Sequence, residues 1–295
     1  MTKLTFIYQI ALIFLLALVS MHTKGNEKFP AYSSNQAHQR LLTEITVIDK
    51  RLFAVGERGH IISSSDGVNW QQADVPVNVL LTSISFSDAQ TGFAVGHDST
   101  ILKTKDGGAT WKLVNFQPEL DRPLLAVQAK GSTVIAVGAY GAYWQSVDGG
   151  KNWNSIFHDG LLLPEDKEYL DDLKDRDPEG YKNEQKYLLP HFNDVLLGKQ
   201  AWYLSGEAGF LAKSSDNGKT WNKIETDYFG SFFAVTERTD GSLAVAGLRG
   251  NLFLENAYKA FDASKMPGNA TINDIFVDDN VMLMFANSGN FYYSI

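Results

Sequence analysis

Apolar residues recur along the chain in short runs that end at glycines, a pattern typical of β-strands joined by tight turns. A small apolar strand repeatedly ends in a Gly-x-x-Gly turn, as in AVGERG, AVGAYG, LSGEAG and AVAGLRG. AVGHDS has a serine in place of the second glycine, and FANSG keeps only one glycine. Together these landmarks divide the chain into six repeated units.

A second motif follows four of these turns and ends in tryptophan. It reads SSSDGVNW, TKDGGATW, SVDGGKNW and SDNGKTW, and the successive tryptophans are 41, 42 and 68 residues apart. Its aspartate and tryptophan pairs are Asp66 and Trp70, Asp106 and Trp111, Asp148 and Trp153, and Asp216 and Trp221. Each unit therefore predicts four strands, with the aspartate in the turn before the last strand. We expect the carboxylate to accept backbone N–H groups there and the tryptophan to pack between units. The alternative, a series of catalytic acids or calcium ligands, is disfavoured because such a group is needed once and not in every repeat.

Four strands in about 41 residues match one blade of a β-propeller. The predicted fold is all-β, a six-bladed β-propeller of four-stranded blades with Asp-box turns, and a seven-bladed propeller is the alternative. The sixth unit stops after its third strand. Because an open sheet edge invites aggregation, we expect an N-terminal strand from residues of about 28–37 to close the ring.

The N-terminus predicts export. Lys3 precedes an apolar run from Leu4 to Val19, and the polar sequence SMHTKG follows. We interpret residues 1–25 as a signal peptide, which predicts a periplasmic location, with an uncleaved N-terminal anchor as the alternative. Residues 26–295 then form a single β-propeller domain.

One insertion of about 27 residues interrupts the repeats at 164–190, with nine acidic and five basic residues. Pro164 and the acidic residues that follow it predict a helix that begins there and extends to about Arg176. A second short helix is expected at 183–189. Its two interpretations are a lid or docking element over the central channel and a solvated decoration.

Composition narrows the possible chemistry. The 295 residues contain no cysteine, which excludes disulfides and thiolate metal sites, and the six histidines show no metal-ligand spacing. With 26 basic and 34 acidic residues the formal net charge is −8, so a nucleic-acid partner is not expected. We predict no cofactor and no bound metal.

The repeats resemble a known family. The Asp boxes resemble the bacterial neuraminidase repeat, and the composite A-V-G-x-x-G-x-I-x-x-[S/T]-x-D-G-G-x-T-W resembles the photosystem II stability and assembly factors and their relatives in non-photosynthetic bacteria. The resemblance covers roughly residues 38–295. It implies a non-catalytic exported propeller that assembles or holds a membrane protein complex, with a membrane protein or envelope complex subunit as its partner. A sialidase-like glycosidase or a carbohydrate-binding propeller is the alternative, although no Phe-Arg-Ile-Pro-like segment occurs near the start.

Propeller geometry also predicts which residues share a surface. The Gly-x-x-Gly turns and the connections between blades lie on one face, with the insertion, and the Asp-box turns lie on the other. The resemblance implies an arginine-bearing patch, which we carry over to Arg58 and Arg249 with Arg122 as an addition. The alternative is a set of solvated loop charges. The candidate partner-binding residues on this face are Arg58, Arg249, Arg122, Arg40, Glu57, His97, Asp98, Tyr140 and Glu207.

Overall fold

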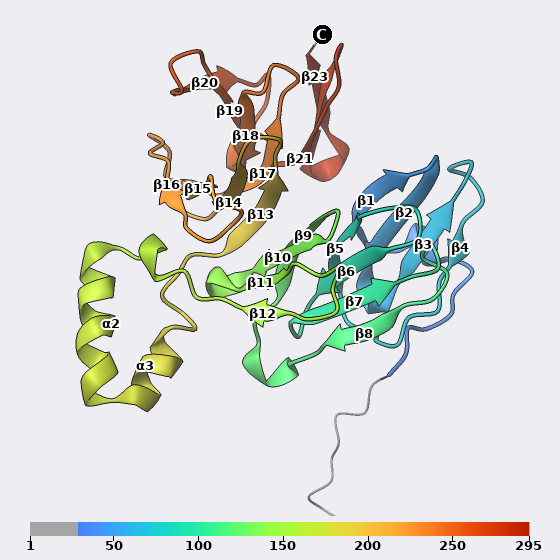
Figure 1. The fold of residues 1–295 in the computed structure, drawn as a ribbon. Helices are drawn as coiled ribbons and strands as arrows, with labels where there is room; N and C mark the ends of the chain where they lie inside the picture. Colours follow the sequence, from blue (N-terminus) through green and yellow to red (C-terminus); the bar gives the residue numbers. More distant parts are fainter. Residues whose placement is uncertain (1–28, 295) are drawn as a thin grey trace, which may run out of the picture.

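The computed structural model describes residues 29–294, in which antiparallel sheets follow one another in chain order (Figure 1). The predicted signal peptide and the alternative anchor lie outside the described residues. Between residues 29 and 294, neither of the two α-helices is long and apolar enough to cross a lipid bilayer.

Sheets 1 to 5 are each a meander of four strands, and sheet 6 has three. Sheets 1 and 2 contain β1 (Leu42–Ile48), β2 (Arg51–Gly56), β3 (Ile61–Ser64) and β4 (Gln71–Gln72), then β5 (Leu81–Phe86), β6 (Gly92–Gly96), β7 (Thr100–Thr104) and β8 (Lys112–Asn115). Sheets 3 and 4 contain β9 (Leu124–Lys130), β10 (Thr133–Gly138), β11 (Tyr143–Ser146) and β12 (Asn154–Ser155), then β13 (Phe192–Leu197), β14 (Trp202–Gly206), β15 (Leu211–Ser214) and β16 (Asn222–Lys223). Sheets 5 and 6 contain β17 (Phe232–Glu237), β18 (Leu243–Gly247), β19 (Asn251–Glu255) and β20 (Phe261–Lys265), then β21 (Ile272–Val277), β22 (Met282–Ala286) and β23 (Phe291–Ser294).

The first strands of successive sheets lie next to one another. β1 contacts β5, β5 contacts β9, and the series continues through β13 and β17 to β21. This arrangement is consistent with a β-propeller, and it confirms the predicted all-β architecture of repeated, mostly four-stranded sheets. Sheets 1 and 6 stand apart at the two ends of the series (Figure 1). Apolar side chains are exposed on both, including Ile45 and Val47 on β1 and Phe276 and Phe285 on sheet 6.

The expected closing strand is not formed by the described part of the N-terminal segment. Residues 29–37 pair with no strand of sheet 6; instead the Ala31 N–H donates to the Val75 carbonyl and the Ser34 N–H to Gln72 Oε1. Ala37, in the 3-10 helix η1 (Ala37–Gln39), is buried against Ala54 and Ile62 of sheet 1. The prediction was wrong because the apolar contacts of this segment are made with sheet 1.

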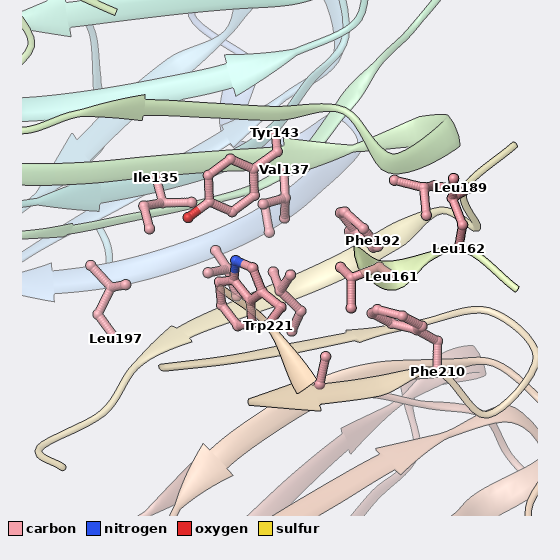
Figure 2. Packing of buried hydrophobic residues seen from close by; sticks show 14 of the residues in the cluster. Ile135, Val137, Tyr143, Leu161, Leu162, Leu189, Phe192, Leu197, Phe210 and Trp221 are labelled. Atoms are coloured by element: carbon pink, nitrogen blue, oxygen red, sulfur yellow. The ribbon is translucent and has the colours of Figure 1, made fainter. Parts of the chain in front are cut away.

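Tryptophans and other aromatic residues fill the spaces between neighbouring sheets. The Trp221 ring of sheet 4 lies edge-on to Tyr143 of sheet 3, with 6.1 Å between ring centroids. Trp153 meets Phe93 in the same way at 6.0 Å. Figure 2 shows the cluster between sheets 3 and 4, in which Trp221 and Tyr143 belong to one continuous apolar core. The inter-sheet packing therefore follows the repeat.

The Asp-box carboxylates are engaged by their own turns. Asp106 Oδ1 accepts the Thr110 N–H at 3.0 Å, and Oδ2 accepts the Thr110 hydroxyl at 2.5 Å. These hydrogen bonds to Thr110 lower the pKa of Asp106 to about 2, and bonds to Thr220 do the same for Asp216. Hydrogen bonds from the turn residue before tryptophan also lower the pKa of Asp66 and Asp148. The acceptor sites that a substrate or metal would use are thus occupied within the turns.

The insertion forms two helices, α2 (Pro164–Arg176) and α3 (Pro178–Glu184). α2 has the predicted bounds, whereas α3 begins before the predicted position because Asp177 caps it by accepting the Gly180 N–H at 2.9 Å. The helices lie beside sheets 3 and 4 and not over the first strands that surround the axis (Figure 1). In this position the helices do not cover the first strands, and the interpretation of the insertion as a docking element stays a prediction.

Candidate partner-binding surface

The Gly-x-x-Gly turns share one backbone geometry. Three of the four form a short 3-10 turn, η2 (Glu57–Gly59), η4 (Ala139–Gly141) and η6 (Leu248–Gly250). The second turn residue adopts a left-handed conformation, with φ of 57° at Arg58, 53° at Tyr140 and 57° at Arg249. Non-glycine residues adopt this conformation uncommonly, so its recurrence reflects a constraint of the repeat.

The constraint comes from close backbone approach on both sides of the turn. A β-carbon on Gly56 would overlap the carbonyl oxygen of Leu41, in the segment that leads into β1. At Gly209, φ is +71°, and a β-carbon would overlap the carbonyl oxygen of Tyr228 in the connection to the next sheet. Glycine is therefore required at these two positions, where the backbone of a neighbouring connection leaves no room for a side chain.

Hydrogen bonds place the turns and the connections at the same end of the sheets. The Gln117 N–H donates to the Asp98 carbonyl at 2.7 Å, and the Ser99 hydroxyl donates to the Arg122 carbonyl at 2.7 Å. Arg122 Nη2 in turn donates to the carbonyl of Tyr140 at 2.8 Å. These bonds link the turn of sheet 2, the connection to sheet 3 and the turn of sheet 3 into one surface, here called the turn face.

The insertion belongs to the turn face. The Tyr140 ring lies edge-on to Tyr187, 5.4 Å away, and to His191, 4.6 Å away. Leu189 packs so closely on Gly141 that a β-carbon there would overlap its side chain. The end of the insertion is thus fixed against the turn of sheet 3, at the same end of the molecule as the candidate residues.

Two groups on this face have distinctive electrostatics. The Arg122 guanidinium is partly buried, burial lowers its pKa, and its Nε has no hydrogen-bond partner among the described residues. Glu207 Oε1 lies 3.5 Å from His191 Nδ1, and its other oxygen accepts the His191 N–H at 3.3 Å. Glu207 therefore joins the turn of sheet 4 to the end of the insertion.

The predicted arginines do not form one compact patch. Arg40 and Arg58 lie beside sheet 1, and Arg249 lies on sheet 5. Burial is the main cause of the lowered pKa of His60, and the positive charges of Arg58 and Arg40 lower it further. Arg122 lies between them in the connection to sheet 3. The remaining candidates are divided among the turns of sheets 1 to 4: Glu57 is half-buried, His97 is exposed, Asp98 is half-buried, and Tyr140 and Glu207 lie beside the insertion.

Sequence reasoning missed a cavity of about 590 Å³ on the turn face. Its wall includes apolar residues at the two ends of the insertion, Leu163 just before it and Leu189 within it. Phe210 of sheet 4 and Phe229 of the segment after sheet 4 complete this wall. We call it the insertion cavity. The apolar run LLLP before α2 was the available signal, but the other wall comes from residues more than forty positions away.

Sequence reasoning also missed three acids around a second cavity of about 480 Å³ at the inner strands. Burial raises the pKa of Glu44 to about 8 and that of Asp194 to about 7, and it also raises the pKa of Asp274. Glu44 Oε2 accepts the Ile84 N–H of the next sheet at 2.8 Å, and Asp194 Oδ2 accepts the Val235 N–H at 2.9 Å. Glu44 and Asp194 thus tie neighbouring first strands together, whereas Asp274 accepts the Ile275 N–H of its own strand. Within residues 29–294, no group of three or more His, Asp or Glu side chains is placed to hold a metal ion.

Comparison with known proteins confirms the family resemblance of the repeats. Residues 61–179 match the family described as photosynthesis system II assembly factor YCF48. The chain is 28% identical over 187 residues to the photosystem II assembly lipoprotein Ycf48 of Synechococcus sp. (strain CC9902), covering 62% of this chain and 48% of that protein. It is 25% identical over 203 residues to the photosystem II stability/assembly factor HCF136 of Arabidopsis thaliana, covering 63% and 46%. The chain thus spans about half the length of the curated relatives it matches.

Solved structures share the fold at low sequence identity. A structure of YCF48 bound to D1 peptide has a TM-score of 0.62 and 16% identity, covering 86% of this chain and 77% of that one. An ancestral GH74 enzyme has a TM-score of 0.62 and 12% identity, covering 86% and 38%. At these identities the likeness concerns the fold alone.

Proposed function

We propose that this chain, whose repeats match those of the photosystem II assembly factor family, is a non-catalytic exported protein that binds a segment of a membrane protein during assembly of its complex. The observation that carries the proposal is the turn face. There the between-sheet connections, the Gly-x-x-Gly turns and the end of the insertion meet through short hydrogen bonds and aromatic contacts. A surface built from loops on a rigid scaffold is a common arrangement for binding.

The names of the relatives support the kind of partner. The curated relatives are called assembly or stability factors of photosystem II, several of them lipoproteins, and one similar structure is that of YCF48 bound to D1 peptide. By analogy we infer an exported location and a membrane protein client or envelope complex subunit for this chain. Arg58 and Arg249, both exposed on left-handed turns, are the proposed contacts from the arginine-bearing set.

A glycosidase is the weaker candidate. Hydrolysis of a glycosidic bond generally uses two carboxyl groups that flank the substrate. The four Asp-box carboxylates are bound within their own turns, and Glu44 and Asp194 accept backbone N–H groups of neighbouring sheets. These described carboxylates therefore have structural roles, which favours a binding protein.

Co-purification tests the proposal. The tagged chain is expressed in its host, membranes are solubilised in mild detergent, and captured proteins are identified by mass spectrometry. We expect an integral membrane protein to be captured by the wild type and lost from the Arg58→Ala/Arg249→Ala variant. Arg238→Ala is the control, because this arginine belongs to the hairpin that joins β17 to β18 and, among residues 29–294, its side chain bonds only within that hairpin, to Ser242 and Asp240. Equal capture by all three proteins would refute a role for the arginine-bearing turns, and release of sugar from a glycoside panel would favour the enzyme.

A further inference from the structure

The insertion cavity has a rigid apolar floor. Leu161, Leu162 and Leu189 are buried from the insertion side, and Phe210 is buried from the turn of sheet 4. Figure 2 shows these four side chains grouped at one end of the core between sheets 3 and 4. The Phe210 ring also stacks on Phe192, with 5.1 Å between centroids. Because the floor belongs to the protein core, the cavity is formed before any ligand arrives.

Its rim leaves large apolar side chains in water. Phe229 is 90% exposed, Tyr187 57%, Leu163 50% and Tyr140 36%, and all four line this one cavity. A concave site of about 590 Å³ lies within the usual range for ligand pockets. Exposed aromatic groups around a concave apolar site are typical of surfaces that bind another molecule.

Charge on the rim is mainly negative. Asp166, Glu207 and Glu225 line the cavity, and the accompanying bases are Lys223 and His191, the latter beside Glu207. Among the described residues, Asp166 and Glu225 form no ion pair. The insertion adds nine acids against five bases, in a chain of net charge −8. A cationic ligand is therefore favoured on approach and at the rim.

We propose that the insertion cavity binds a peptide segment of a partner protein in which an aromatic or long aliphatic side chain stands next to a lysine or arginine. The apolar side chain enters between Leu163, Phe210 and Phe229, and the basic group pairs with Asp166 or Glu225. The inference rests on the proposed protein-binding function and names the sequence that one of its subsites selects. It adds a second contact region, opposite in charge to the arginine-bearing turns.

Selection from a library of random peptides displayed on phage, with the purified exported chain as bait, tests the inference. Enriched peptides should share an apolar residue beside Lys or Arg. One enriched peptide is then synthesised with a fluorescent label, and its dissociation constant is measured by anisotropy. Failure to enrich any peptide, or enrichment of acidic or purely polar peptides, would overturn the inference.

Variants then locate the binding site. Phe229→Ala should weaken binding of the labelled peptide about tenfold, since an aromatic group at the rim of an apolar site commonly contributes strongly. Tyr258→Ala is the matched control, because Tyr258 is 92% exposed but lies outside the cavity. Equal affinity of the wild type and both variants would place the peptide elsewhere and refute the proposal.

The charge component has its own control. Asp166→Asn should weaken binding roughly two- to fivefold at low salt and hardly at high salt, as expected for a partly exposed ion pair. Asp279→Asn, at the exposed hairpin of sheet 6, should leave the affinity unchanged. An equal loss in both variants would show that only the overall charge matters.

The Arg58→Ala/Arg249→Ala variant separates this inference from the proposed function. It should bind the labelled peptide as the wild type does, because neither arginine lines the cavity. If the membrane protein fails to co-purify while the peptide still depends on Phe229, the proposed assembly role fails and the cavity assignment stands. If the membrane protein is captured but binding of the selected peptides does not depend on Phe229, the cavity assignment fails and the proposed assembly role stands.

Discussion

Replacing Glu44 by glutamine should stabilise the protein at neutral pH and have little effect in acid. Glu44 lies on the first strand of sheet 1, beside the cavity at the inner strands, and its Oε2 accepts the Ile84 N–H. Glutamine has nearly the same shape and can accept the same hydrogen bond. The substitution therefore removes a titration without removing the tie between sheets 1 and 2.

The size of the effect follows from the pKa of Glu44, which burial raises from 4.5 to about 8. Between these values the unfolded chain has released a proton that the folded chain still holds, so stability falls as the pH rises through this window. At pH 7 this difference in protonation lowers the free energy of unfolding by about 3 kcal/mol at most, because each pKa unit corresponds to about 1.4 kcal/mol. Glu44 is only half-buried and lines the cavity of about 480 Å³, so screening by solvent reduces this effect. We expect Glu44→Gln to gain about 2 kcal/mol at pH 7, or roughly 5 °C in Tm.

Thermal unfolding followed by tryptophan fluorescence, from about pH 4 to pH 8, measures this gain. The two proteins should be equally stable near pH 4, where the glutamate is protonated in both states, and should diverge as the pH rises. Glu119→Gln, at an exposed glutamate in the turn η3 (Pro118–Leu120), is the control. A constant difference between Glu44→Gln and wild type at every pH, or a less stable variant at pH 7, would refute the assignment of a buried, protonated carboxyl.

Two further predictions concern the Asp boxes. Trp221→Ala should lower the free energy of unfolding in urea by about 3–5 kcal/mol, because the indole is 6% exposed between sheets 3 and 4. Trp70→Ala should lower it less, because Trp70 is only half-buried. Equal losses in the two variants would contradict this packing account. The pKa of Asp106 is lowered to about 2, so the stability that its hydrogen bonds to Thr110 provide is present above pH 3.8 and is lost as the pH falls toward 2. Asp106→Asn should lose this acid dependence in thermal unfolding, and an unchanged pH profile would show that the turn does not depend on the carboxylate.

Local signals predicted the parts of the structure that depend on local chemistry. The glycine pairs located the turns because the backbone at Gly56 and Gly209 leaves no room for a β-carbon. The proline and acids at the start of α2 gave its bounds, and the regular spacing of tryptophans gave the repeated sheets. The shared location of turns and insertion followed from strand alternation alone.

Features that depend on distant segments could not be predicted in the same way. The contact of Ala37 with sheet 1 is a tertiary contact that the sequence pattern does not predict. Glu44 and Asp194 come from strands about 150 residues apart in the chain and share one cavity only after the sheets assemble. Phe229 and Leu163 likewise line one cavity, although nothing near either residue in the sequence indicates the other.

The left-handed residue in each turn is a position where the side chain can vary without a change of fold. Its backbone torsion is maintained by the packed connections and, in five of the six turns, by a following glycine, so the side chain can change while the architecture stays the same. β-Branched residues are poorly suited to this torsion, which limits the residue types that can occupy the position. From sheet 1 to sheet 6 the position is occupied by Arg58, Asp98, Tyr140, Ala208, Arg249 and Ser288. Mutation at these positions could therefore change the chemistry of the turn face one sheet at a time and leave the apolar interior untouched.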